Sequence, residues 1–143
     1  MIVASRSQLA EISRLAAASY PAECCGLLAG ADVSDSGVRI TRVVPSDNVA
    51  QTDTRDSFEI NPQTRFDLMQ ALDGTDERIV GHYHSHPDHA AEPSRKDLAM
   101  VYEPELYWLI ASVIDHAVHD IKAFRATPDA ATFVPVPIRI IEE

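Results

Sequence analysis

The sequence predicts an α/β (α+β) domain with a mixed, largely antiparallel central sheet flanked by helices. Helical periodicity and strand-like apolar runs occur in the same chain, and they do not follow the strict strand–helix–strand alternation of parallel sheets. The chain has 143 residues, of which 45% are hydrophobic and 24% are charged. This length and composition are typical of one globular domain, so we expect a single domain over residues 1–143.

The first expected element is a helix over residues 5–20. Apolar side chains recur there at helical spacing, and Ser5 with Gln8 three positions later matches a capping box. The helix is expected to stop at Pro21, because proline cannot continue it.

A hairpin is expected next. Residues 24–29 form a short apolar run that Gly30 ends, which is typical of a buried strand. Turn-forming residues occupy positions 32–37, and residues 38–44 alternate between apolar and polar side chains as a half-buried strand does.

The middle of the chain predicts a loop, a helix and a strand. Residues 45–57 are polar and lack periodicity, which indicates a loop. Asn61 as cap and Pro62 at the first helical position begin a second helix, which is expected to end near Gly74. Residues 78–86 then read as a strand.

The last third of the chain is expected to add one short helix and further strands. The helix spans residues 94–102, and the apolar run 107–114 forms a strand that pairs with residues 118–125. Residues 132–141 are extended, and their two prolines confine them to a sheet edge.

Charge and cysteine content exclude several partners and settings. With 12 basic and 22 acidic residues the net charge is −10, which disfavours binding to nucleic acid and to anionic membranes. The two cysteines, Cys24 and Cys25, are adjacent and form no metal-binding or redox motif, so a reducing, cytoplasmic setting is expected. The N-terminal residues lack the pattern of a secretory signal, and no apolar run approaches the length of a membrane span.

The most informative stretch is residues 81–89, which contain four of the six histidines. In a strand, His82, His84 and His86 project from one face with about 6.5–7 Å between successive Cα atoms. Two neighbours can therefore reach one metal ion, and imidazole is a common zinc ligand. A histidine pair in a strand is also compatible with ordinary packing, so a third ligand is needed to favour a metal site.

Asp97 is the candidate for that ligand. Ser94 and Asp97 have the spacing of a capping box at a helix start, which on its own indicates only a helix cap. If the loop over residues 87–93 turns this helix back over the strand end, then His84, His86 and Asp97 form a site of two histidines and one carboxylate. Such a site polarises a bound water and hydrolyses carbonyl compounds when a general base stands nearby.

These residues resemble a known family. The run His84-Ser85-His86-Pro87, followed after six residues by Ser94-x-x-Asp97, is similar to the zinc motif of the JAMM (MPN-plus) metallopeptidases. Residues 23–30 resemble the strand that carries the family's catalytic glutamate, and the resemblance extends over residues 9–125. It implies a JAMM/MPN fold, with a layout similar to that of cytidine deaminases, in the small stand-alone bacterial branch of the family.

The resemblance also implies roles for individual residues. His84, His86 and Asp97 would bind one Zn²⁺ per chain, Glu23 would act as general base and acid, and Ser94 would donate a hydrogen bond to the oxyanion. His82 shares the ligand face and is interpreted as a packing residue near the site, as Trp108 and Cys25 are in the core. The role of His89 stays open.

The implied function is that of a zinc peptidase or isopeptidase. It would hydrolyse the bond after the C-terminal glycine of a ubiquitin-like protein, such as a bacterial sulfur carrier, and release cysteine or a short extension, as in cysteine biosynthesis. Two alternatives are a non-catalytic MPN module that binds a ubiquitin-like protein, and a zinc nucleobase deaminase. The deaminase is disfavoured because its His-x-Glu and Pro-Cys-x-x-Cys patterns are absent. The carrier, the length of the removed group and the oligomeric state, a homodimer included, stay open.

Overall fold

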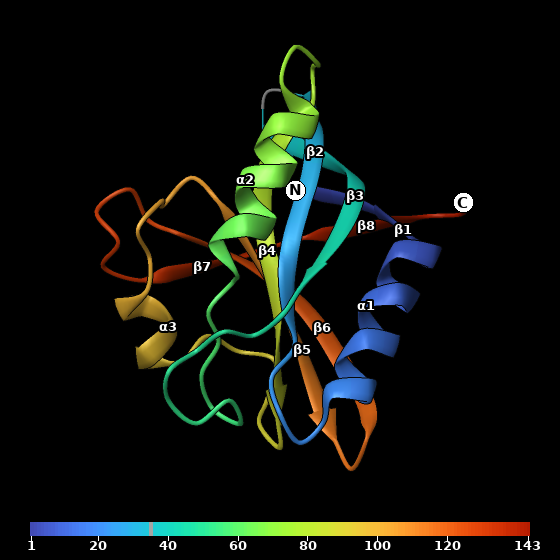
Figure 1. Ribbon diagram of the computed structural model, residues 1–143. Coiled ribbons are helices and arrows are strands. Elements are labelled where there is room, and N and C mark those ends of the chain that lie inside the picture. The colour runs from blue at the N-terminus through green and yellow to red at the C-terminus, as the bar shows by residue number, and fades with distance from the viewer. Residues whose placement is uncertain (35) are drawn as a thin grey trace.

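The computed structural model describes residues 1–34 and 36–143. One sheet of eight strands forms its centre, and three helices accompany it in the described residues (Figure 1). In chain order the elements are β1 (Ile2–Ser5), α1 (Arg6–Ser19), β2 (Cys25–Ser34), β3 (Gly37–Ser46), α2 (Pro62–Leu72), β4 (Arg78–Pro87), α3 (Arg95–Ala99), β5 (Tyr107–Ile114), β6 (Ala117–Ala126), β7 (Phe133–Val136) and β8 (Ile138–Ile141).

The strands lie in the order β7-β6-β5-β4-β2-β3-β1-β8. The pairs β2–β3, β2–β4, β5–β6 and β6–β7 are antiparallel, whereas β4–β5, β1–β3 and β1–β8 are parallel. The predicted mixed, largely antiparallel sheet is therefore confirmed. β4 lies between β2 and β5, which places it in the middle of the sheet.

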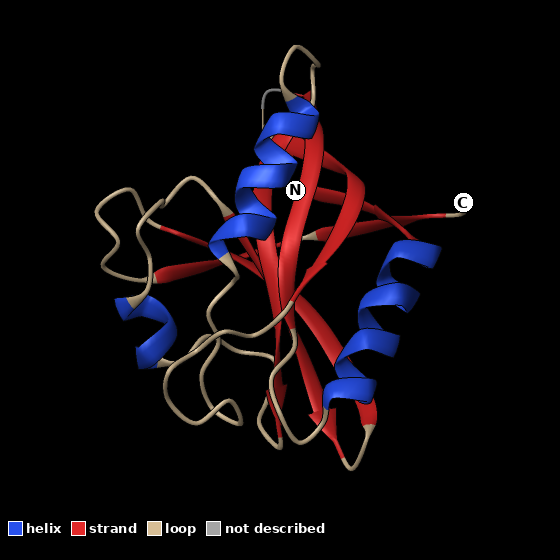
Figure 2. Cartoon of the chain, viewed as in Figure 1, coloured by secondary structure: helices blue, strands red, loops and turns tan. Residues whose placement is uncertain are grey.

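Helices cover both faces of the sheet (Figure 2). Ile12 of α1 packs in the same cluster as Leu28, whereas Leu68 of α2 packs in the cluster of Leu27. Because neighbouring residues of a strand point to opposite faces, α1 and α2 lie on opposite sides of β2. The α2 face also holds a third cluster, which includes Trp108 and the partly buried residues that follow α3.

Local capping accounts for the starts of the two longer helices. The Ser5 hydroxyl accepts a hydrogen bond from the Gln8 amide at 3.1 Å, and the Gln8 side chain accepts one from the Ser5 amide at 2.9 Å. This is the expected capping box. Asn61 caps α2 by accepting the Gln63 amide hydrogen at 3.0 Å, with Pro62 at the first helical position.

The expected end of the first hairpin strand was wrong. Gly30 does not end β2, which continues to Ser34 through a register shift at Ala29 and Gly30. A Cβ at Gly30 would lie 2.5 Å from the carbonyl oxygen of Arg39, so glycine permits the close approach of β3 there. Within the expected turn over residues 32–37, residue 35 lies outside the described residues.

The two ends of the chain also differ from expectation. Instead of one extended edge segment over residues 132–141, β7 and β8 lie at opposite edges of the sheet with only Pro137 between them. Pro137 still accepts a hydrogen bond from the Ile2 amide at 3.0 Å. β1 was not predicted. All four of its residues are buried between two strands, so its sequence lacks the alternation of apolar and polar residues that indicates a half-buried strand. α3 is shorter than expected and ends at Ala99.

No helix among the residues that the structure describes is long and apolar enough to cross a membrane.

Candidate metal centre

The candidate site lies on the α2 face of the central strand β4. The backbone of His84 pairs with Cys25 of β2 on one side and with Ile110 of β5 on the other. His82 and His86 share this face by strand alternation, as expected. Ligands on a central strand are held rigidly by the hydrogen bonds of both neighbours.

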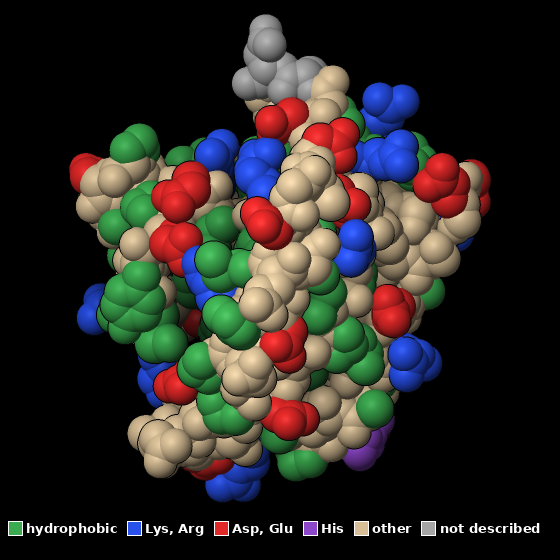
Figure 3. Space-filling model, turned by 45° about the horizontal axis from the view of Figure 1, so that its top comes forward, with side chains coloured by type: hydrophobic (Ala, Val, Ile, Leu, Met, Phe, Trp, Pro, Cys, Tyr) green, Lys and Arg blue, Asp and Glu red, His purple; other side chains and the backbone are tan. Residues whose placement is uncertain are grey.

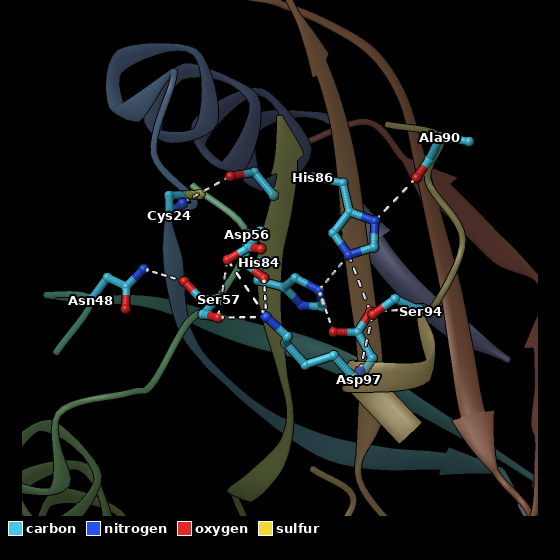
Figure 4. Close-up of polar contacts among 11 residues, drawn as sticks. Cys24, Asn48, Asp56, Ser57, His84, His86, Ala90, Ser94 and Asp97 are labelled. Atoms are coloured by element: carbon cyan, nitrogen blue, oxygen red, sulfur yellow. Dashed lines mark hydrogen bonds and ion pairs between the residues drawn. The ribbon is translucent and has the colours of Figure 1, made fainter. Parts of the chain in front are cut away.

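Three side chains converge there from two elements. The Nε2 atoms of His84 and His86 are 3.0 Å apart, and Asp97 of α3 reaches both rings (Figure 4). Its Oδ2 lies 3.1 Å from His86 Nε2, and its Oδ1 lies 3.4 Å from His84 Nε2. All three residues are buried, and their ligand atoms lie within 4.8 Å of one another. The chain reversal after β4 therefore brings the expected residues together.

The surrounding hydrogen bonds suit a metal ion. His86 Nδ1 lies 3.1 Å from the Ala90 carbonyl, so this nitrogen carries a proton, and Nε2 is the atom that would present its lone pair to a bound metal ion. The Ser94 amide donates to Asp97 Oδ2 at 2.9 Å, and the Ser94 hydroxyl accepts the Asp97 amide hydrogen at 3.0 Å. Two imidazoles and one oriented carboxylate are the ligand set of zinc sites that leave a fourth position open.

The electrostatics favour an ionised carboxylate. Burial alone raises the pKa of Asp97, but the hydrogen bonds from His84 and His86 outweigh it and hold this pKa well below its ordinary range. Burial lowers the pKa of His84. Burial also opposes the charge on His86, yet the contact with Asp97 leaves the pKa of His86 raised. The group thus combines an anionic ligand with imidazole, as zinc requires.

Glu23 stands beside this group, two residues before β2 begins. Its amide donates to the Thr54 carbonyl at 2.7 Å, and its carbonyl accepts from the Asn48 side chain at 3.2 Å. Together with His86, Ser94 and Asp97, Glu23 lines a cavity of about 400 Å³. Burial raises the pKa of Glu23 to about 8. A carboxyl group in this pKa range can both take up and release a proton near neutral pH.

The chain matches a known protein family over most of its length. The family model described as prokaryotic homologs of the JAB domain, Prok-JAB, matches residues 5–127. The chain belongs to the Prok-JAB family.

Relatives of this Prok-JAB domain, and the solved structure of another protein with the same fold, agree with that assignment. The CysO-cysteine peptidase of Mycobacterium tuberculosis is 31% identical over 119 residues, which cover 83% of this chain and 78% of the relative. The desampylase of Haloferax volcanii is 37% identical over 98 residues, which cover 68% and 67% of the two chains. A JAB1/MPN domain protein from Archaeoglobus fulgidus shares the fold, with a TM-score of 0.63 at 18% identity over 99% of this chain and 100% of that one.

These similarities confirm the predicted JAMM/MPN relationship of the Prok-JAB domain. Two of its relatives are named as a peptidase and a desampylase, and the chain is a JAMM-type hydrolase. Neither the non-catalytic module nor the nucleobase deaminase is favoured.

The loop over residues 47–61 contributes contacts that the sequence did not reveal. Phe58 stacks on His84 with 4.2 Å between ring centroids. Lys96 of α3 donates to the Ser57 hydroxyl at 3.0 Å and lies 3.5 Å from Asp56 Oδ1. The loop has no periodicity from which these contacts could be predicted. The one sequence feature that pointed to them is the position of Lys96 next to Asp97.

The structure also shows the surroundings of three further residues that the sequence analysis singled out. His82 packs against Trp108 with 4.3 Å between ring centroids, and burial lowers the pKa of His82 to about 3. His89 lines the cavity beside Glu23. The Cys25 thiol is buried, and burial raises its pKa to about 12, which agrees with a packing residue rather than a nucleophile.

Proposed function

We propose that this protein is a zinc-dependent peptidase that hydrolyses the bond after the C-terminal glycine of a ubiquitin-like sulfur carrier, releasing cysteine or a short extension. The observation that carries the proposal is the buried group of His84, His86 and Asp97 beside a cavity that Glu23 and Ser94 also line. The similarity to a CysO-cysteine peptidase and a desampylase supports this substrate class.

In this mechanism His84, His86 and Asp97 would hold one zinc ion. When bound, zinc supplies a Lewis acid that lowers the pKa of a water molecule and polarises a carbonyl group. The hydrogen bond from His86 to Ala90 keeps the His86 ring in the tautomer that a metal needs. Burial of the group excludes bulk water and strengthens the electrostatic interactions within it.

Glu23 moves the proton. As water adds to the scissile carbonyl carbon, the Glu23 carboxylate accepts a water proton, and the new C–O bond leaves a tetrahedral intermediate. Glu23 then gives this proton to the leaving amine as the C–N bond breaks. The buried position, which raises the pKa of Glu23, matches a group that must serve as base and then as acid.

Ser94 stabilises the tetrahedral intermediate. Its oxygen already accepts the Asp97 amide hydrogen at 3.0 Å, so the hydroxyl proton stays available for donation. Donors of this kind typically lower the barrier by about 3 to 4 kcal/mol. Ser94 thus joins the start of α3 to the chemistry of the cavity.

The shape and charge of the surface suit an extended, small-residue tail. The 400 Å³ cavity and a neighbouring hollow of about 300 Å³ share Asp56, Lys96 and Asp97 in their linings. Glycines, which have no side chain, fit hollows of this size. Basic and acidic side chains are interspersed on the face shown in Figure 3, and the net charge of −10 favours a carrier with a basic docking face.

Mass spectrometry of a carrier conjugate tests the proposal. Purified protein with one equivalent of zinc should shorten a sulfur carrier that bears a C-terminal cysteine to the form that ends in glycine. Glu23→Gln should abolish the cleavage. Glu142→Gln is the matched control, because Glu142 is exposed and pairs with Arg6 outside the cavity. The proposal fails if the wild-type protein leaves every conjugate intact, or if Glu23→Gln cleaves at the wild-type rate.

We further propose that residues 1–143 act as one catalytic domain in the cytoplasm. Cys24 and Cys25 support this setting because both are buried free thiols, which a reducing compartment preserves.

A further inference from the structure

The two histidines of the candidate centre differ at their outer nitrogens. His86 Nδ1 meets the Ala90 carbonyl at 3.1 Å. His84 Nδ1 is buried and has no hydrogen-bond partner among residues 1–34 and 36–143. Histidines that bind metals almost always donate this second N–H to an acceptor, which fixes the tautomer and the direction of the ring. On its Nδ1 side, therefore, something other than a hydrogen bond must orient the His84 ring.

An aromatic ring lies flat against His84. The Phe58 ring stacks on the imidazole with 4.2 Å between centroids and an interplanar angle of 16°. Trp108 meets His84 edge-on at 5.6 Å and 84°. Rotation of the imidazole about its Cβ–Cγ bond would drive its edge into the Phe58 face, so the stack restricts the direction in which Nε2 points.

The position of Phe58 is itself anchored at two points. The carbonyl of the preceding residue, Ser57, accepts from the Asn48 side chain at 2.9 Å, and the Ser57 hydroxyl accepts from Lys96 at 3.0 Å. Asn48 also holds the carbonyl of Glu23. These contacts tie the Phe58 backbone both to the strand that follows Glu23 and to α3.

We propose that Phe58 is a positioning residue for His84 and replaces the missing hydrogen bond to Nδ1. The proposal deepens the proposed zinc site and rests on it. The stacking of Phe58 on His84 also favours the zinc-bound protein over the metal-free protein. An imidazole that shares its lone pair with a dication becomes electron-poor, and an electron-poor ring is attracted to the negative face of a phenyl group.

Zinc affinity of the metal-free protein, measured by competition with a chromophoric chelator, tests this inference without catalysis. Phe58→Leu keeps an apolar side chain but removes the ring, and should weaken zinc binding by about 10- to 100-fold, the usual effect of losing a residue that orients a ligand. Phe58→Tyr keeps the ring and should bind zinc like the wild type. Phe133→Leu is the matched control, because Phe133 packs on Trp108 at 5.1 Å in the same cluster without stacking on His84.

A second readout reports geometry directly. With Co²⁺ in place of zinc, the visible absorption bands of Phe58→Leu should shift and weaken, whereas those of Phe58→Tyr and Phe133→Leu should match the wild type. Circular dichroism verifies the fold of each variant, and Phe58→Met replaces Phe58→Leu if the latter does not fold.

The outcomes separate this inference from the proposed function. If the wild type binds one zinc and Phe58→Leu binds it equally well, Phe58 does not position His84. If Phe133→Leu loses as much affinity as Phe58→Leu, general packing explains the effect and the inference is wrong. If the wild type and His86→Ala both fail to bind zinc, the proposed zinc site itself is refuted.

Discussion

Replacement of Glu23 by glutamine should stabilise the metal-free protein increasingly as the pH rises. Burial, opposed by the nearby His86, raises the pKa of Glu23 from 4.5 to about 8 in the folded state. Between these values the unfolded chain releases the proton while the folded chain retains it, so folding becomes less favourable as pH increases. The slope is about 1.4 kcal/mol per pH unit, which amounts to about 2.7 kcal/mol between pH 5.5 and 7.5.

Urea unfolding in the presence of a chelator, followed by circular dichroism at pH 5.5, 6.5 and 7.5, measures this difference. The quantity to read is the unfolding free energy of Glu23→Gln minus that of the wild type, because all other residues are the same in both proteins. Glu142→Gln provides a flat reference, since the pKa of Glu142 is lowered by Arg6 and lies below this range. Parallel pH profiles for wild type and Glu23→Gln would show that Glu23 is already ionised at pH 5.5.

Two further substitutions test the cap of α3 and the packing of β2 against β4. Ser94→Ala should cost about 1 kcal/mol of unfolding free energy through the lost cap on Asp97, and should lower kcat by about 100- to 1000-fold if Ser94 stabilises the oxyanion. Urea unfolding and conjugate turnover measure the two effects, and an unchanged kcat would remove Ser94 from the mechanism. Gly26→Ala would bring a Cβ into steric overlap with the hydroxyl end of the buried Tyr83 side chain and should destabilise the protein by about 1 to 3 kcal/mol. An unchanged melting temperature would show that Tyr83 can move aside.

The features that could be predicted from the sequence are those that depend on neighbouring residues. The caps at Ser5, Asn61 and Ser94 depend on residues two or three positions away, and all three appear at helix starts. Strand alternation placed His84 and His86 on one face. Asp97 contacts these histidines after a single chain reversal between β4 and α3, so this contact could also be predicted from the sequence.

The remaining features depend on contacts between distant segments. The position of Glu23 beside His86 follows from the antiparallel register of β2 and β4, which no local pattern reveals, so the family resemblance alone pointed to it. The stack of Phe58 on His84 joins a loop without periodicity to a strand 26 positions later. The separation of β7 and β8 to opposite edges is likewise a property of the whole sheet.

The pairing of β1 has a consequence for the order of folding. Ile2 lies opposite Val38 of β3 on one side and opposite Ile138 of β8 on the other. The pairing of β1 with β8 therefore closes a loop of well over a hundred residues. Contacts between residues so far apart in the sequence slow folding most. The strands that carry the histidines and follow Glu23 pair over much shorter separations. The centre of the sheet can thus assemble early, and closure of the edge by β8 becomes the late step.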